Sequence, residues 1–444
     1  MKTFKITTLG CKVNQCESEA LVQCLKSAGW TPVDGEETAD LCIINTCTVT
    51  HKASMQSRQA ARQAIRRHPE ARVLVTGCYA QTEPEAIARI EGVDAIVGHG
   101  EKHRIPELVD RHSDETTGEH PATHCPNIGQ ERTFRRIPLT EIGARTRPFL
   151  KIQDGCDAFC TYCIVPHARG RSRSLPPEAV LDGIRALAGS GYHEVVLSGV
   201  HLGCYGNDLT PKTDLLWLLK EIDREGDIDR VRISSIEPHE LTDGIIDLVA
   251  GSNRFCRHFH IPLQSGDDNI VKRMGRPYTR ADFGNLVHRI RTQIPDAAIG
   301  ADVLVGFPGE DDSAFSNTFD LIRELSITYL HVFPFSPRKG TPAAVFSDQV
   351  SVDTVKERCR QLRELGDIKK KAFLEGFPGE TVTVLVESKR DRKIGKLKGI
   401  ASNYLTVLFN GADELQNSLV EVKIEAVKGN VLIGAPSNNR TPAG

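Results

Sequence analysis

The sequence predicts a multidomain α/β protein with three parts: a doubly wound parallel α/β domain, a partial (βα)6 barrel and a small five-stranded β-barrel of OB-like size. Strand and helix patterns alternate over residues 1–111 and again over residues 146–376, as in parallel βαβ units. Residues 377–440 instead show short alternating β segments separated by Gly and Asn turns. The length of 444 residues also fits three domains at about 150 residues each.

The first part contains four predicted strands, each followed by a helical pattern. The strands are Phe4–Leu9, Leu41–Asn45, Arg72–Thr76 and Asp94–Val97. Asn14 with Glu17 three residues later matches a capping box and predicts the start of the first helix. The later helical patterns end at Arg67 or cover Glu83–Glu91 and Pro106–Arg111. Residues 112–145 are polar, contain three prolines and predict a linker.

From Pro148 the alternation restarts and gives six strands with helices between them. The predicted strands are Phe149–Gln153, Glu194–Leu197, Arg230–Ile236, His258–Leu263, Ile299–Val305 and Tyr329–Phe335. The predicted helices are Pro176–Ala188, Leu215–Arg224, Asp243–Ala250, Arg280–Gln293, Asp311–Leu325 and Ser351–Glu375. Six βα units are too few to close an eightfold barrel, so an open partial barrel is expected.

The last part reads as five short strands. They are Thr381–Glu387, Gly395–Ala401, Leu405–Phe409, Leu419–Val427 and Asn430–Ile433. Short strands at this spacing, with Gly and Asn at the turns, are typical of a small barrel.

Composition and charge exclude several classes of protein. Hydrophobic residues at 39% and charged residues at 26% are ordinary for a globular chain and argue against disorder. Lys and Arg (56) nearly balance Asp and Glu (58), so any nucleic-acid site must be a local patch. No apolar run approaches the roughly 18 residues of a membrane span, and the first residues turn polar too early for a secretory signal. We expect a cytoplasmic protein with no membrane partner.

The densest chemical signal is a C-x3-C-x2-C loop after the first strand of the partial barrel, formed by Cys156, Cys160 and Cys163. Three thiolates on one tight loop can hold a cubane iron–sulfur cluster and leave its fourth iron open. Such an iron can chelate S-adenosylmethionine, which one-electron reduction then cleaves to a carbon radical. The alternative is a zinc knuckle with His167 as the fourth ligand.

A second set of three cysteines is dispersed along the first domain. Cys11, Cys47 and Cys78 each follow a predicted parallel strand. Ligands of doubly wound sheets bind outside the carboxyl ends of the strands, so these thiols can meet at one point, although unrelated loop cysteines remain the alternative. The remaining seven of the 13 cysteines are expected to be packing or incidental residues. They are Cys16, Cys24, Cys42, Cys125, Cys204, Cys256 and Cys359.

With these motifs the chain resembles the radical S-adenosylmethionine methylthiotransferases over essentially its whole length. The resemblance rests on residues 155–163 followed by IVPHARGR, and on TLGCKVNQCESE (8–19), NTCTVT (45–50), ISSIEP (233–238) and HFHIPLQSG (258–266). It implies an auxiliary cluster domain, a radical domain and a C-terminal TRAM domain. The motifs are similar to the branch that acts on N6-threonylcarbamoyladenosine at position 37 of tRNA.

The resemblance implies replacement of a C2 hydrogen of adenine by a methylthio group. It implies two 4Fe-4S clusters, with S-adenosylmethionine as both methyl donor and radical source. The expected partners are the tRNA anticodon loop, an external one-electron donor of flavodoxin or ferredoxin type, and a sulfur source. Around the cofactor we expect residues at the carboxyl ends of the barrel strands. These are Tyr162, Ser198, Gly199, Ser235, Glu237 and Gln264.

Two groups of basic residues are expected to meet RNA phosphates. Arg169, Arg171 and Arg173 follow the radical loop, and the others crowd one hairpin of the last domain. The hairpin residues are Lys389, Arg390, Arg392, Lys393, Lys396 and Lys398. Two alternatives stay open at this point: a methylthiotransferase for isopentenyladenosine tRNA or a ribosomal protein, and a zinc-stabilised RNA-binding protein without catalysis.

Overall fold

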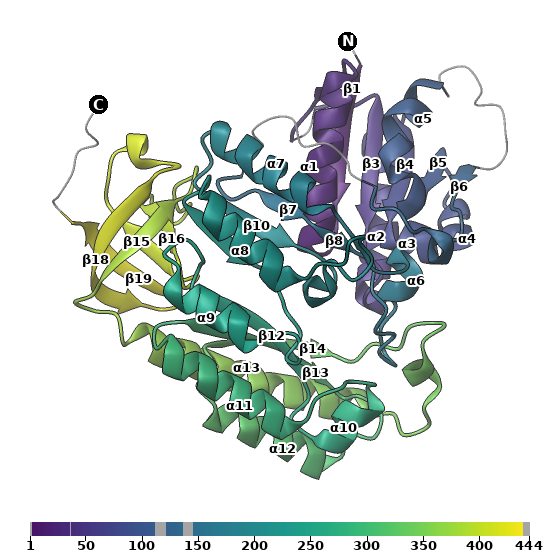
Figure 1. Cartoon of the computed structure of the whole chain (residues 1–444). Helices are drawn as coiled ribbons and strands as arrows, with labels where there is room; N and C mark the ends of the chain where they lie inside the picture. The colour runs from purple at the N-terminus through teal and green to yellow at the C-terminus, as the bar shows by residue number, and fades with distance from the viewer. Residues whose placement is uncertain (1, 36, 112–120, 136–144, 438–444) are drawn as a thin grey trace.

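The computed structural model describes residues 2–35, 37–111, 121–135 and 145–437. Figure 1 shows three parts side by side: an N-terminal α/β domain in purple and blue, a central open barrel in teal and green, and a C-terminal barrel in yellow. The central part lies between the other two. In the described residues, no helix is long and apolar enough to cross a membrane.

The N-terminal domain is built on a six-stranded parallel sheet in the order β2-β1-β3-β4-β5-β6. The strands are β1 (Thr3–Thr8), β2 (Thr31–Pro32), β3 (Leu41–Thr46), β4 (Arg72–Gly77), β5 (Ala95–Val97) and β6 (Ala122–His124). The helices are α1 (Lys12–Ser27), α2 (His51–Arg67), α3 (Cys78–Thr82), α4 (Pro84–Ala88) and α5 (Ile105–Arg111). Leu41 and Ile43 pack on one face of the sheet, while Cys42 and Ile44 pack on the other. The doubly wound prediction is therefore confirmed.

Two details of this domain differ from the sequence prediction. Strand β6 lies inside the predicted linker and pairs in parallel with β5, so part of residues 112–145 belongs to the sheet. Helix α1 begins at Lys12 with Cys11 at its N-cap, so the predicted capping box is wrong. Asn14 instead donates to the carbonyls of Leu9 (2.7 Å) and Thr46 (2.9 Å), and Glu17 is buried inside the helix.

The central domain has six parallel strands in two runs, β11-β10-β7 and β12-β13-β14. The strands are β7 (Phe149–Lys151), β10 (Glu194–Ser198), β11 (Arg230–Ile233), β12 (His258–Gln264), β13 (Ala298–Val305) and β14 (Tyr329–Pro334). A parallel bridge between Val231 and Phe255 links the runs. Strands β7 and β14 are the two open edges, which confirms the partial barrel.

Helices cover the outside of this open barrel. The long ones are α7 (Pro177–Gly189), α8 (Leu215–Glu225), α9 (Asp243–Gly251), α11 (Arg280–Gln293), α12 (Asp312–Glu324) and α13 (Val352–Leu374). Two short helices and a small hairpin lie near the cysteine loop. These are α6 (Val165–Arg169), α10 (Asp268–Arg273), β8 (Gln153–Asp154) and β9 (Arg173–Ser174). One large apolar core joins the strands to the long helices.

The C-terminal domain is a closed barrel in the order β15-β16-β17-β19-β18, as predicted. The strands are β15 (Thr381–Val386), β16 (Leu397–Ala401), β17 (Thr406–Phe409), β18 (Leu419–Lys428) and β19 (Val431–Pro436). Side chains such as Val384, Phe409 and Val422 fill its interior.

Hydrogen bonds connect the central domain to both neighbours. Arg232 Nη1 donates to the carbonyl of Ser402 at 2.8 Å, and its Nη2 donates to that of Ala401 at 3.1 Å. On the other side, Arg338 reaches into the N-terminal domain and bonds Thr48 (2.8 Å) and Glu83 (3.1 Å). These contacts set the places where pockets form between domains.

Candidate functional site

The C-x3-C-x2-C loop is held in a tight turn between β8 and α6. Gly155 has φ +74°, and a Cβ there would lie 1.9 Å from the carbonyl oxygen of Arg171, so only glycine fits. The backbone N–H of Cys156 donates to the carbonyl of Gly170 at 3.0 Å, and that of Cys163 donates to the carbonyl of Cys160 at 2.9 Å. The three cysteines of the loop are free thiols.

Burial is the main influence on these thiols. It raises the pKa of Cys160, and it raises the pKa of Cys163 to about 12. Neighbouring thiols of the same loop contribute in the same direction, so the three groups lie close together. His201 Nδ1 lies 3.3 Å from Cys156 Sγ.

The second triad forms where the strands of the N-terminal sheet end. Cys11 caps α1, Cys47 follows β3 and Cys78 begins α3 after β4. A Cβ on Gly10 would lie 2.8 Å from Cys47 Sγ, and one on Gly77 would lie 2.5 Å from the Thr46 carbonyl oxygen. The two glycines thus allow the three loops to converge as the sequence predicts. Cys47 and Cys78 are buried, while Cys11 is exposed.

The zinc-knuckle alternative needs three thiolates and a fourth ligand gathered around one ion. Two thiolates on one zinc, at a Zn–S distance of about 2.3 Å, lie about 3.8 Å apart. In the described residues, neither triad belongs to a group whose ligand atoms all lie within 4.8 Å of one another, and His167 belongs to no such group either. His167 is exposed and packs edge-on against Phe159. Three thiolates on one loop, with no fourth ligand supplied by the exposed His167, fit a cubane iron–sulfur cluster with one open iron.

A buried charge network lies beside the second triad. Glu17 and Asp154 are its two carboxylates, and four cations surround them. The cations are Lys102, Lys151, Arg169 and Arg173. The network thus holds more positive than negative charge. An iron–sulfur cluster held by the thiolates of the second triad would be anionic and would balance that excess. The charge network therefore fits a cluster at this triad.

Arg169 belongs to this network and not to a surface, so its predicted contact with RNA phosphates is wrong. Its side chain is only 2% exposed, with Nη1 3.0 Å from Glu17 and 2.9 Å from Asp154. Although burial lowers it, the pKa of Arg169 is raised well above its usual value by these two carboxylates and by the thiol of Cys78. Arg173 is buried as well, whereas Arg171 is exposed and pairs with Asp157 at 2.9 Å.

A pocket of about 390 Å³ opens beside the radical loop at the carboxyl ends of the strands. Four of the predicted cofactor residues line it: Tyr162, Ser235, Glu237 and Gln264. The predicted Ser198 and Gly199 do not. Ser198 is buried in β10, and a Cβ on Gly199 would meet Leu202 and Gln153.

Several residues of this pocket were missed by the sequence reasoning. Val49 and Thr50 come from the N-terminal domain, just after Cys47, so the pocket spans two domains. The NTCTVT motif was the signal that could have placed them there. Others come from loops and strand ends of the barrel: His201, Arg276, Asp302 and Phe333.

Arg276 organises one wall of the pocket. Its Nη2 donates to the hydroxyl of Tyr162 at 2.9 Å, and its Nη1 pairs with Glu237. Burial raises the pKa of the Tyr162 phenol well above its usual value, so the hydroxyl stays protonated. The Tyr162 ring is therefore fixed in place between two cysteines of the loop.

A polar group at this pocket joins Ser235, which follows β11, to His260 on β12 and Asp302 on β13. Ser235 Oγ lies 2.5 Å from His260 Nδ1, and His260 Nε2 lies 3.1 Å from Asp302. Asp302 also lies 3.2 Å from His331 Nδ1. Although burial raises it, the pKa of Asp302 is held below its usual value by these two histidines.

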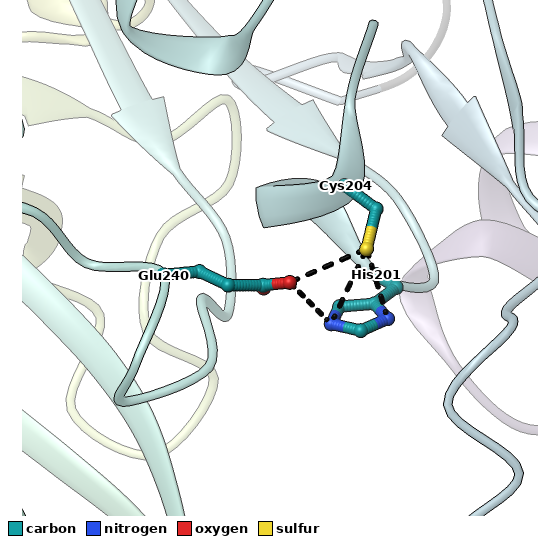
Figure 2. A group of neighbouring side chains, drawn as sticks. All are labelled: His201, Cys204 and Glu240. Atoms are coloured by element: carbon teal, nitrogen blue, oxygen red, sulfur yellow. Dashed lines mark hydrogen bonds and ion pairs between the residues drawn. The ribbon is translucent and has the colours of Figure 1, made fainter. Parts of the chain in front are cut away.

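Figure 2 shows a second polar group, in which His201, Cys204 and Glu240 converge. Glu240 Oε1 lies 2.9 Å from His201 Nε2 and 3.3 Å from Cys204 Sγ. Although burial lowers it, the pKa of His201 is raised by its contacts with Cys156, Cys204 and Glu240. Cys204 is therefore no incidental residue, because it belongs to a group that contacts a cysteine of the radical loop.

A larger cleft of about 690 Å³ lies where the three domains meet. Five of the predicted basic hairpin residues line it: Lys389, Arg390, Arg392, Lys393 and Lys398. Lys396 of the same hairpin is not among them. Four cations from outside the C-terminal barrel, which the sequence reasoning missed, also line it: Lys12, Arg145, Arg147 and Arg232.

Comparisons with known proteins agree with this geometry. Residues 150–322 match the model of the radical SAM superfamily, and residues 3–98 match "Uncharacterized protein family UPF0004". A solved structure of the radical S-adenosylmethionine methyltransferase TsrM from Kitasatospora setae shares the fold, with a TM-score of 0.57 at 17% identity over 78% of this chain and 77% of that one. The protein is thus a radical S-adenosylmethionine enzyme.

Similarity to two curated relatives shows which family of radical S-adenosylmethionine enzymes the chain belongs to. The chain is 40% identical to the threonylcarbamoyladenosine tRNA methylthiotransferase MtaB of Bacillus subtilis, over 96% of this chain and 94% of that protein. It is 35% identical to a tRNA-2-methylthio-N(6)-dimethylallyladenosine synthase of Pelotomaculum thermopropionicum, over 99% of this chain and 98% of that protein. The chain belongs to the radical S-adenosylmethionine methylthiotransferase family.

Proposed function

We propose that this protein converts N6-threonylcarbamoyladenosine in the anticodon loop of tRNA to its 2-methylthio derivative. The observation that carries the proposal is the pocket of about 390 Å³, which is lined by the radical loop and by residues that follow Cys47 of the second triad. A base in this pocket would face both triads. The name of the Bacillus subtilis relative supports the choice of base.

The radical loop would hold one 4Fe-4S cluster through Cys156, Cys160 and Cys163. When bound there with S-adenosylmethionine, this group supplies the one-electron chemistry that can remove an unactivated C–H hydrogen. The side chains of the pocket would bind and orient S-adenosylmethionine and the base. Arg276 and Glu237 fix the Tyr162 ring against the cofactor side of the pocket. Polar groups of Ser235 and Gln264 are available to S-adenosylmethionine or to the base.

The second triad would hold the other cluster through Cys11, Cys47 and Cys78. Buried Arg169 and Lys102 would balance its negative charge, and Cys11 is exposed, so the group would be accessible from solvent. Sulfur would leave from here, so a sulfur source must restore it. Electrons would come from an external donor of flavodoxin or ferredoxin type, and we expect the reaction to take place in the cytoplasm.

The test is an anaerobic reaction with two matched tRNA substrates, one carrying N6-threonylcarbamoyladenosine and one carrying isopentenyladenosine. Nucleoside mass spectrometry measures the 2-methylthio product of each. We expect product from the first and at most a trace from the second. Product from the isopentenyladenosine substrate alone would contradict the choice of base. No product from either, with iron and S-adenosylmethionine cleavage intact, would contradict tRNA as the substrate.

A further inference from the structure

A group of three side chains beside the radical loop has the composition of a metal site. It brings together an imidazole, a thiol and a carboxylate, from His201, Cys204 and Glu240 (Figure 2). The proposed function gives none of the three a role, although His201 lines the pocket beside the radical loop. Imidazole, thiolate and carboxylate are the three kinds of side chain that bind Zn²⁺ in proteins. The group is therefore a candidate cation site apart from the two cysteine triads.

Two loops that follow neighbouring strands bring the three side chains together. His201 is the N-cap of the 3-10 helix η3 (Leu202–Cys204), which follows β10. The backbone N–H of Cys204 donates to the carbonyl of His201 at 3.1 Å, so a single turn holds both side chains. Glu240 lies in the turn that follows β11, the strand that pairs with β10. Two residues between successive ligands, as in His-x2-Cys, is a common spacing in zinc sites.

The three ligand atoms are spaced as they would be around one ion. Glu240 Oε1 lies 2.9 Å from His201 Nε2 and 3.3 Å from Cys204 Sγ. Cys204 Sγ lies 3.8 Å from His201 Nε2. Ligands of one tetrahedral Zn²⁺, at Zn–N and Zn–O distances of about 2.1 Å and a Zn–S distance of about 2.3 Å, lie about 3.4–3.6 Å apart. The observed separations bracket these values, so small side-chain rotations would accommodate the ion.

One atom of the group has no partner in the protein. Glu240 Oε2 is buried and accepts no hydrogen bond among the described residues. Gly203 lies directly against it, because a Cβ at this position would be only 2.0 Å away. A buried carboxylate oxygen without a donor is costly, and buried polar atoms in folded proteins normally have a partner. A cation bound by the Glu240 carboxylate would compensate this oxygen.

The other ring nitrogen of His201 connects the group to the radical loop. His201 Nδ1 lies 3.3 Å from Cys156 Sγ. Metal-bound histidines almost always donate their second ring N–H to a nearby acceptor, which fixes the orientation of the ring. The backbone supports the same placement, because Gln153 Oε1 accepts from the N–H of His201 at 2.7 Å. Gln153 Nε2 in turn donates to the carbonyl of Gly155 at 2.8 Å, so one side chain ties both loops together.

A fourth ligand is within reach of the same point. His239 directly precedes Glu240, and its Nε2 lies 3.8 Å from Glu240 Oε1. Its side chain is 36% exposed, so it can turn toward the group without disturbing the core. Either this imidazole or a water molecule would complete a four-coordinate site.

We propose that His201, Cys204 and Glu240 bind one Zn²⁺ ion, which joins the loops after β10 and β11 beside the radical loop. The thiolate and the carboxylate balance the charge of the ion. Binding stabilises the folded chain, because the unfolded chain has no preformed site. The rival arrangement contains no metal: a protonated His201 donates to Glu240 and to the neighbouring sulfurs. Neither arrangement depends on which tRNA base is modified.

Zinc content and zinc coordination are measured in the holoenzyme. Both clusters are first reconstituted anaerobically, the protein is then equilibrated with Zn²⁺, and excess metal is removed. We expect about one zinc per chain in addition to about eight irons. X-ray absorption at the zinc edge should show one sulfur neighbour at about 2.3 Å and nitrogen or oxygen neighbours at about 2.0–2.2 Å.

Variants of two ligands test the assignment. Cys204→Ala and Glu240→Gln should each weaken zinc binding by about 100-fold or more in competition with a chelator, because loss of an outer partner alone costs about 10- to 100-fold. Iron content should stay unchanged in both. Zinc should raise the thermal midpoint of the unmodified holoenzyme and not that of Cys204→Ala. The matched control is Cys24→Ala, which removes a half-buried thiol of α1 outside this group and should keep full zinc affinity.

Several results would overturn the proposal. Zinc far below one per chain at full iron content would favour the hydrogen-bonded arrangement without metal. Three sulfur neighbours would place the ion on a cysteine triad. No sulfur neighbour would place it on His260, Asp302 and His331, the other group of close ligand atoms in the part of the chain that the structure describes. Equal zinc affinity in Cys204→Ala and Cys24→Ala would also contradict it. All of these leave the proposed methylthiolation to its own test, the nucleoside product.

Discussion

Glu17 lies at the centre of the contact between the first two domains. Its carboxylate lies 2.8 Å from Lys151 and 3.0 Å from Arg169 and also pairs with Lys102. Although burial raises it, the pKa of Glu17 is held well below its usual value by these cations. A lowered pKa in the folded state means that this carboxylate stabilises the fold at pH values above its unfolded pKa of about 4.3. This contribution is lost as the pH falls further.

At the residue scale, Arg169→Met should destabilise the protein strongly. The substitution leaves Glu17 and Asp154 buried with fewer partners, at a cost of about 3–5 kcal/mol. The measurement is the free energy of unfolding in urea at pH 7 under anaerobic conditions. Arg171→Met, which removes an exposed partner of Asp157 from the same segment, is the matched control and should change stability little. Equal losses in the two variants would contradict the buried network, and adding Glu17→Gln to Arg169→Met should recover part of the loss.

At the scale of elements, the second triad depends on how three strands of one sheet end. Strands β3 and β4 are paired in register up to Thr46 and Gly77, so their next residues start at the same level. Gly77 has φ +97° and leaves no room for a Cβ beside Thr46. Parallel strand ends and a sharp turn together place Cys47 and Cys78 at one point.

Gly77→Ala should therefore remove the second cluster and spare the first. We expect the iron content after anaerobic reconstitution to fall from about eight to about four per chain, with S-adenosylmethionine cleavage retained. Gly29→Ala is the control, because Gly29 has φ +85° and nothing within 4 Å of an added Cβ. It bears the same backbone strain of about 1 kcal/mol without the steric clash. Full iron content in Gly77→Ala would show that the turn is not required.

At the scale of the whole molecule, the proposed function divides its tasks among the three domains. Arg338 ties the barrel to the N-terminal domain, and Arg232 ties it to the C-terminal barrel. The three-domain cleft and the pocket beside the radical loop lie between the domains that these contacts connect. We therefore expect methylthiolation to need all three domains, packed against one another.

Cys47→Ala separates these tasks. It should leave reductive cleavage of S-adenosylmethionine within about twofold of the unmodified protein, because the radical loop is untouched. It should abolish the 2-methylthio nucleoside, because one ligand of the second triad is lost. Cleavage is followed by release of 5′-deoxyadenosine and product by nucleoside mass spectrometry. Equal loss of both would show that the two triads do not act independently.

The fold and both cysteine triads follow from local sequence patterns. Apolar residues that recur with a period of 2 predict the strands, and those that recur with a period of 3.6 predict the helices. Cysteines that follow parallel strands predict where the thiols meet. Arg169 shows the limit of this reasoning, since a basic residue after the radical loop looks like a phosphate contact. Its partners Glu17 and Asp154 come from elsewhere in the chain, and nothing in the local sequence pairs them with it.

The order of strands and helices and the position of Cys11, Cys47 and Cys78 directly after parallel strands were already visible in the amino-acid sequence, because both are read from residues adjacent in the chain. The basic cleft and the pocket beside the radical loop were not, because lining residues such as Lys12, Arg147, Tyr404 and Phe333 lie in different domains and only domain packing brings their surfaces together. Burial of charge was also decided by the tertiary structure. A sequence shows that a side chain is charged, while its partners and its access to water depend on what folds over it.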